Sequence, residues 1–172
     1  SEIHYNPGDM ANASELEFIE LYNTDSNQLN LANWKLTKAV EFNFTAGHNI
    51  AAESALVIVG FDVTDSTKLS AFRTQYGMAE SVTVIGPWTG TLSNAGEALE
   101  LQKNDILEVP INGTAPFYPM VFVERVRYDD KVPWPVSPDG QGNSLERVDP
   151  YAWSDTENNW GASTGNPTPD SL

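Results

Sequence analysis

Oxygen-bearing side chains gather in one Pro- and Gly-rich stretch of the sequence, and they are of the types that bind calcium. Asp129, Asp130, Asp139 and Asn143 flank a segment whose backbone could fold around an ion. Calcium prefers several oxygen ligands from carboxylates, Asn side chains and backbone carbonyls, which flexible loops supply. The regular Asp-x-Asp-x-Asp-Gly spacing is absent, so a solvated acidic loop is the alternative. We therefore carry calcium as the candidate cofactor, with these four residues as its metal ligands.

Three tryptophans suggest a second kind of site, because all three lie in predicted loops. An exposed indole can stack on the C–H face of a sugar ring, and Trp88, Trp134 and Trp153 stand where such rings could be presented. The alternative is that an indole in a Pro-rich segment packs onto the core, where its large apolar surface is buried. The sequence thus predicts these three residues as ligand-binding candidates and leaves the packing alternative open.

Residues suited to hydrolysis are scarce. The chain has two histidines, His4 in a predicted strand and His48 in a turn, and no Gly-x-Ser-x-Gly elbow accompanies them. We expect both to be surface or cap residues. Glu17 and Glu20 lie three positions apart on an alternating strand, so they point to opposite faces and do not converge on one bond. No catalytic residue is assigned, and a hydrolase is the third functional hypothesis.

Charge and composition restrict the classes of function. The 172 residues contain 9 Lys and Arg against 24 Asp and Glu, which gives a net charge of -15 and a pI near 4.2. Such a chain repels phosphate backbones, and its basic residues are scattered, so we expect no nucleic-acid partner. Cys is absent, which excludes disulfides, thiol catalysis and Cys-ligated metals.

The length suits one domain with its own core, which we expect to be a monomer in isolation. No apolar run reaches the roughly 20 residues that cross a bilayer, so no membrane span is predicted. The chain begins without Met and without a signal-peptide pattern. We therefore expect an excised domain or a processed chain.

Short β-rich runs between turn residues predict a sandwich or barrel that positions these side chains. Residues 17–22 alternate between apolar and mixed faces, whereas 55–59 are apolar on both faces and indicate a strand covered on both sides. Asp65 or Ser66 can cap a short helix that Gly77 would end. Further strands are predicted at 81–85, 98–102, 106–109 and 120–128, the last with Phe122, Val126 and Tyr128 on one face.

The C-terminal part has a different composition. From about Pro133 it is rich in Pro, Gly, Asn and Asp, which disfavours regular structure. It also carries tryptophans that ordinary disorder would not. We interpret it as an irregular segment that wraps the sandwich and packs its aromatic residues onto it, with residues 166–172 frayed.

The order of these features resembles the lamin tail domain family over residues 1 to about 110. Residues 128–160 look like the extension of bacterial members of that family. The resemblance implies an immunoglobulin-like β-sandwich of non-catalytic character. The motifs that carry it are 17–23, 29–36, 44–47, 55–59, 86–88 and 92–97.

Physical reasons account for several of these motif residues. Asn23 is expected to satisfy backbone groups at the end of its strand, and Gly96 to adopt a positive φ in a hairpin. We therefore predict an all-β fold, an immunoglobulin-like β-sandwich with one short helix and a long irregular C-terminal extension. It forms one domain, 1–172, with a core at about 1–110, an extension at about 111–165 and the frayed tail 166–172.

The favoured function is a non-catalytic binding module. We expect one domain of a larger secreted or cell-surface bacterial protein, located outside the cell or on its surface. Its partner is predicted to be a protein or a cell-surface polysaccharide. The alternative is a carbohydrate-binding module with a structural calcium.

Overall fold

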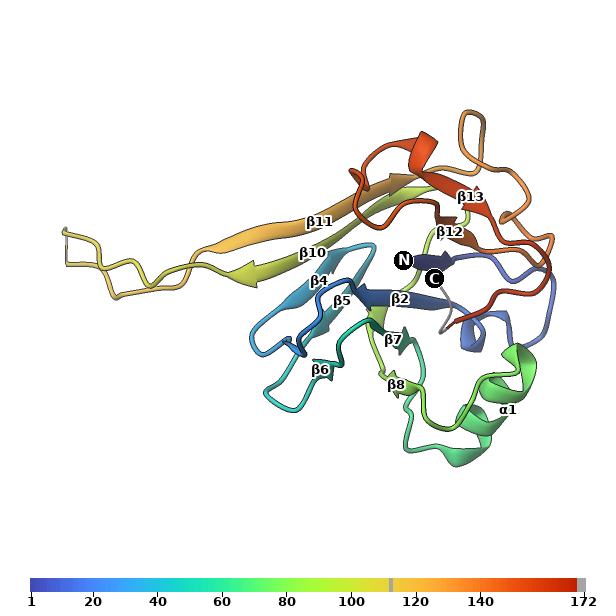
Figure 1. Ribbon diagram of the computed structural model, residues 1–172, viewed down its shortest axis with the longest axis horizontal. Coiled ribbons are helices and arrows are strands. Elements are labelled where there is room, and N and C mark those ends of the chain that lie inside the picture. The colour runs from blue at the N-terminus through green and yellow to red at the C-terminus, as the bar shows by residue number, and fades with distance from the viewer. Residues whose placement is uncertain (112, 170–172) are drawn as a thin grey trace.

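Two β-sheets face each other in the computed structural model of the chain, which describes residues 1–111 and 113–169 (Figure 1). The first sheet has six strands in the order β13-β12-β1-β2-β7-β8, and the second has five in the order β11-β10-β4-β5-β9. Their bounds in the first sheet are β1 (Glu2–His4), β2 (Phe18–Asn23), β7 (Ser54–Val59), β8 (Thr83–Ile85), β12 (Leu145–Arg147) and β13 (Trp160–Ala162). In the second they are β4 (Lys35–Lys38), β5 (Val40–Asn43), β9 (Thr89–Gly90), β10 (Glu97–Asn104) and β11 (Met120–Tyr128).

Smaller elements complete the fold. A two-stranded sheet pairs β3 (Leu29–Asn30) with β6 (Asn49–Ile50), and α1 spans Ser66–Tyr76. Two short 3₁₀ helices, Ala13–Glu15 and Glu157–Asn159, lie in the connections. The described residues contain no helix with the length and apolar character that crossing a bilayer requires.

The strand pair β2 and β7 is buried on both faces, as the sequence predicts for 55–59. Ile19 pairs with Ile58, and both side chains enter the core between the two sheets. Phe18 and Val57 point the other way, into a second apolar cluster under α1. The helix is thus the added element that covers the outer face.

The helix begins and ends where its capping residues predict. The side chain of Asp65 accepts hydrogen bonds from the backbone nitrogens of Thr67 at 3.0 Å and Lys68 at 3.3 Å. Gly77 ends the helix in the left-handed conformation, with φ 62°. Phe72 contributes its buried ring to the cluster beneath the helix.

The hairpin of β10 and β11 continues beyond the sandwich as a projecting arm (Figure 1). We define the arm as the described residues of 105–119. The strand predicted at 106–109 is wrong, because there the two chain segments meet only in an isolated bridge between Glu108 and Phe117. Apolar residues alone do not make a ladder where no second layer covers them.

The C-terminal extension is more regular than predicted, because it supplies β12 and β13. In β12, Leu145 pairs with Ile3 of β1, so the extension continues the first sheet. Strands of three residues are too short to show an alternating pattern. Of the tail predicted to fray, Pro167 and Pro169 are buried, and 170–172 lie outside the described residues.

Two residues singled out in the sequence perform the expected structural roles. The Asn23 side chain donates to the backbone oxygens of Asn27 at 2.8 Å and Ala51 at 2.9 Å, and accepts from the nitrogen of Asp25 at 3.1 Å. Gly96 has a φ of 88° in the turn before β10. The role of Asn23 and the positive φ of Gly96 are confirmed, whereas the predicted hairpin is wrong, because β9 and β10 on either side of this turn do not pair.

We expect Gly96→Ala to destabilise the fold strongly. A Cβ at this position would lie 2.6 Å from the carbonyl oxygen of Tyr128, and the positive φ strains any L side chain. Together these effects should lower the free energy of unfolding by about 2–4 kcal/mol. Urea denaturation measures the change.

Gly47→Ala is the matched control, because a Cβ there meets nothing within 4 Å. It should leave the free energy of unfolding within about 0.5 kcal/mol of the parent protein. Equal effects of the two substitutions would contradict the backbone argument for Gly96.

Candidate functional site

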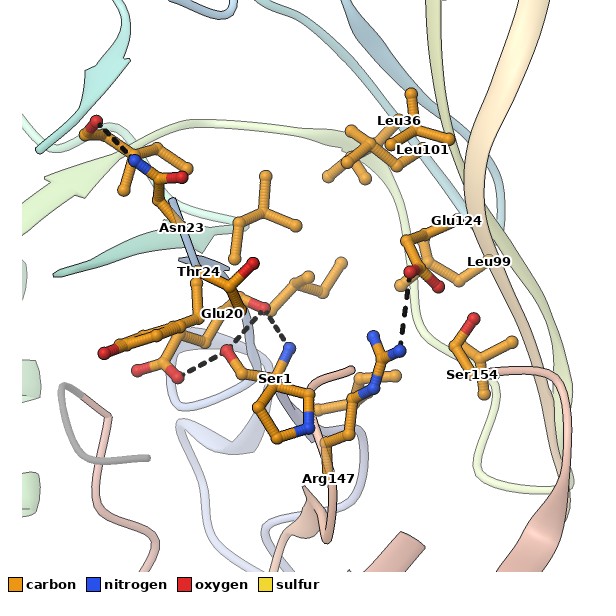
Figure 2. A pocket seen from close by; sticks show the side chains of 18 of the residues that line it. Ser1, Glu20, Asn23, Thr24, Leu36, Leu99, Leu101, Glu124, Arg147 and Ser154 are labelled. Atoms are coloured by element: carbon orange, nitrogen blue, oxygen red, sulfur yellow. Dashed lines mark hydrogen bonds and ion pairs between the residues drawn. The ribbon is translucent and has the colours of Figure 1, made fainter. Parts of the chain in front are cut away.

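A cleft of about 260 Å³ opens between the two sheets (Figure 2). Its walls are mainly aliphatic and come from strands far apart in the sequence. Leu36 of β4 and Leu101 of β10 are paired across their strands and form one wall. The other apolar lining residues include Ile3, Ile19, Leu21, Leu99, Val123 and Val126.

Polar groups stand at one end of the cleft. Arg147 of β12 reaches the carboxylate of Glu124 on β11, with 3.4 Å between Nη2 and Oε1, and donates to the carbonyl oxygen of Ala152. The backbone nitrogen of Ser1 donates to the carbonyl oxygen of Glu20 at 2.9 Å. Within the described residues, Nε of Arg147 and Oε2 of Glu124 are buried without a hydrogen-bond partner.

The loop between β12 and β13 fastens the extension to the outer edge of β11. The carboxylate of Asp155 forms ion pairs with Nε of Arg125 at 3.1 Å and with Nη2 of Arg127 at 2.8 Å. It also accepts a hydrogen bond of 3.1 Å from the backbone nitrogen of Arg127. Burial alone would raise the pKa of Asp155, but the two guanidiniums and their hydrogen bonds keep it below its usual value. Ser154 adds a hydrogen bond of 2.7 Å to the carbonyl oxygen of Arg125.

Three of the four predicted calcium ligands affect the pKa of one buried side chain, Tyr5. Burial, and then the charges of Asp139, Asp130 and Asp129, raise the pKa of Tyr5 far above its usual value. Asp129 accepts a hydrogen bond of 3.1 Å from the backbone nitrogen of Lys131, and Asp130 lies 3.3 Å from the Lys131 ammonium. These carboxylates therefore already have protein partners.

The fourth predicted ligand, Asn143, is hydrogen-bonded to the segment that follows β13. Its Nδ2 donates a hydrogen bond of 2.7 Å to the carbonyl oxygen of Ser163. Asp139 accepts a hydrogen bond of 2.6 Å from the side-chain amide of Asn6. Across residues 1–111 and 113–169, no three His, Cys, Asp or Glu side chains are grouped so that they could hold a metal ion. The calcium site at Asp129, Asp130, Asp139 and Asn143 stays a prediction.

The three predicted ligand-binding tryptophans differ in exposure. Trp88 is 6% exposed and Trp134 is 8% exposed, and both belong to the core between the sheets. Trp134 packs against Trp160, with 6.4 Å between the ring centroids. These two rings follow the packing alternative, and neither presents a face to a sugar. Trp153 is 61% exposed.

The expectation of a surface position is wrong for His4. Its ring is buried against Phe18 and Tyr76 on the outer face of the first sheet. The Tyr76 hydroxyl donates to the carbonyl oxygen of Leu16 at 2.7 Å, so Nδ1 of His4 must donate to that hydroxyl at 2.9 Å. Burial lowers the pKa of His4 to about 4, which keeps the ring neutral. His48 lies in its turn as predicted, accepting from the nitrogen of Thr45 at 3.1 Å.

A row of glutamates crosses the same outer face. Glu2 of β1 lies between Glu20 of β2 and Glu146 of β12 in the strand register. Glu2 is hydrogen-bonded to the hydroxyl of Ser144 and to the backbone of Thr168, so the C-terminal tail covers it. Burial first, and the neighbouring glutamates second, raise the pKa of Glu2 to about 8.

Sequence reasoning missed the cleft and its polar end. Phe122 is exposed, although it was predicted to share a face with Val126 and Tyr128, which are buried. The pairing of β10 with β11 shifts by one residue at Leu101, and this bulge reverses the alternation of β11 beyond it. The one signal of the polar end in the sequence was Glu124. This acidic residue lies between Phe122 and Val126 on the face of the predicted strand 120–128 that those two residues share.

The parent protein should become less stable as pH rises, because Glu2 is buried, and we expect Glu2→Gln to prevent this decrease. The folded pKa of about 8 exceeds the usual 4.5, so the unfolded chain releases this proton first as pH rises. Between these two values the parent protein should lose stability that the glutamine variant keeps. The difference in unfolding free energy between the two proteins should change by roughly 4 kcal/mol from pH 4.5 to pH 8.

Glu41→Gln, at an exposed position of β5, is the control. Chemical denaturation at several pH values compares the three proteins. Parallel profiles of the Glu2 variant and the parent would show that Glu2 does not carry this proton.

Comparison with known proteins agrees with this geometry. The model of the Lamin Tail Domain family matches residues 1–111, which is more than half of the chain. The comparisons with curated proteins and with solved structures found no match. The family consists of non-catalytic domains, and the observed sandwich is the immunoglobulin-like fold expected of them. The chain belongs to the lamin tail domain family.

Proposed function

We propose that this domain is a non-catalytic binding module that engages a protein partner through its arm. The observation that carries the proposal is the concentration of exposed apolar side chains there. Six of the thirteen exposed large hydrophobic side chains among the described residues lie in the arm. They are Ile106, Leu107, Val109, Ile111, Phe117 and Tyr118.

The position of these side chains supports an interaction site. Scattered apolar residues are normal on a protein surface, whereas a contiguous apolar patch is typical of an interface. Ile106 is 81% exposed, and the arm projects away from the rest of the molecule (Figure 1). A projecting hairpin can enter a groove that a flat sheet face cannot reach.

The charges of the arm indicate the chemistry of the partner. Residues 105–119 contain Asp105 and Glu108 but neither Lys nor Arg, and the whole chain carries a net charge of -15. Complementary charges speed encounter and exclude wrong partners. We therefore assign the partner an apolar groove with a basic rim. The acidity of the chain argues equally against nucleic acid as the partner.

We place the domain outside the cell or on its surface, as one part of a larger bacterial protein. The resemblance of residues 128–160 to the extension of bacterial members supports this placement. A domain without Cys needs no oxidising compartment, so its composition is compatible with that location.

Photo-cross-linking tests the arm. With p-benzoylphenylalanine in place of Phe117, we expect a distinct cross-linked protein from extracts of the source cells, because this ring is half exposed on the arm. The same group at Val132, which is exposed in the loop after β11, is the control and should not capture that protein.

The captured protein, once purified, should bind the double variant Ile106→Ser, Val109→Ser at least about tenfold more weakly, because the variant removes apolar contact area. Both positions are exposed, so thermal stability should not change. Equal capture at both cross-linking positions, or unchanged affinity of the double variant, would contradict the proposal.

A second candidate function rests on the loop after β12. Tyr151 and Trp153 are both exposed there, two positions apart. The buried side chain of Asn159 donates to the carbonyl oxygens of Asp149 at 2.9 Å and Trp153 at 3.2 Å, which holds the loop in place. Two aromatic rings on an ordered loop could stack on a polysaccharide.

Tryptophan fluorescence tests this candidate with cellohexaose, chitohexaose and mannohexaose as probes. If the loop binds sugar, one of them should change the emission saturably, and Trp153→Ala should abolish the change. Val148→Ala, at an exposed aliphatic position, should not. Absence of any saturable change in the parent protein would remove this candidate.

A further inference from the structure

The side chain of Arg147 is buried at the end of the cleft with few partners. It is 9% exposed, and it makes a long contact to Glu124 (Figure 2). It also donates a hydrogen bond to the carbonyl oxygen of Ala152. Its Nε has no partner among the described residues. A buried charged donor with unmet hydrogen bonds is costly, so another acceptor near this guanidinium would be favourable.

The size and walls of the cleft limit what can occupy it. Its volume of about 260 Å³ is below the range of about 300–1,000 Å³ of sites for drug-sized ligands. Eleven of its 23 lining residues are leucine, isoleucine or valine, and Leu36, Leu99 and Leu101 are among them. One or two aliphatic side chains would fill such a space.

Charge at the cleft favours a neutral acceptor over an anion. The carboxylate of Glu124 stands beside Arg147 and already opposes its charge, and the chain as a whole is strongly acidic. A carboxylate ligand would meet repulsion from both. A peptide carbonyl offers the same acceptor without the charge.

The neighbouring strand offers a path for an extended segment. β11 is the edge strand of the second sheet, and Val123 and Glu124 in it line the cleft. The loop carrying Asp155 covers the edge of β11 around Arg125 and Arg127. The residues of β11 that precede Arg125 have no such cover. Among the described residues, no strand pairs with the outer edge of β11 there.

We propose that the cleft receives one aliphatic side chain from an extended segment of the partner protein, whose backbone carbonyl accepts a hydrogen bond from Arg147. This inference rests on the proposed binding function, because the occupant belongs to a protein. The cleft lies in the body of the sandwich and the arm projects from it, so the two contacts can be tested separately.

Methyl chemical shifts in nuclear magnetic resonance test the cleft with two small probes. N-acetyl-leucine methylamide carries the aliphatic side chain and neutral carbonyls, whereas 4-methylpentanoate carries a similar chain and a carboxylate. We expect the amide to shift the methyl signals of Leu36, Leu99 and Leu101 saturably. The carboxylate should bind at least about tenfold more weakly.

Two variants locate the binding. Leu101→Trp fills the cleft and should abolish the shifts, whereas Val132→Trp, at an exposed position in the loop after β11, is the control and should preserve them. Arg147→Gln should weaken amide binding about tenfold, because it removes a charged hydrogen-bond donor. If this variant does not fold, the Leu101 substitution still decides the result.

Absence of methyl shifts with the amide would overturn the inference, as would binding that survives Leu101→Trp. Tighter binding of the carboxylate would overturn the assignment of a neutral acceptor. None of these measurements involves the arm. A failure here therefore leaves the cross-linking result standing, and a failure of the cross-linking does not affect the cleft.

Discussion

Burial of the first sheet on both faces is the constraint on which the rest of the structure depends. One face of β2 and β7 packs against the second sheet, and the other is covered by α1 and the C-terminal tail. Every side chain of β1 is therefore buried, whatever its polarity. Glu2 and His4 must then find hydrogen-bond partners nearby or stay uncharged. Their shifted pKa values follow from this architecture, because burial is the main cause in both. The polar side chains of Glu2 and His4 are thereby part of the packing that supports the fold.

The C-terminal extension completes the sandwich. The family model matches residues 1–111, which include β10 and its neighbour β4, whereas β11, the strand on the other side of β10, lies beyond the match. The same holds for β12, which covers one edge of β1. Without disulfides, the extension is held by strand pairing, by the contact of Trp134 with Trp160, and by the bonds of Asp155 to β11. The extension also completes the cleft. Arg147 and Glu124 belong to these later strands, and they line the cleft together with residues of the matched region.

The sequence predicts those features that depend on neighbours along the chain. The apolar run at 55–59 predicts a strand covered on both faces, because the pattern is local. Features that depend on distant contacts escape such reasoning. The residues at 106–109 have strand propensity but no layer to pack on, and a bulge in the paired strands turns Phe122 outward. Arg147 shows no motif, since its partner lies on another strand. Asn143 is predicted as a calcium ligand from composition alone, and no pattern in the sequence predicts that its amide donates to the carbonyl oxygen of Ser163.

The pairing of β1 with β12 joins two segments that are far apart in the sequence, and this has a consequence for folding. Ile3 pairs with Leu145, so the first strand cannot be fully enclosed until Leu145 has been synthesised. Contacts at such long sequence separation close slowly, because the entropy of a large loop is lost before the contact is made. During translation the apolar faces of β1 and β2 therefore stay exposed to other chains or to chaperones until β12 emerges. The appearance of the region that matches the family model is thus not enough for this domain to become native, because β12 lies beyond it.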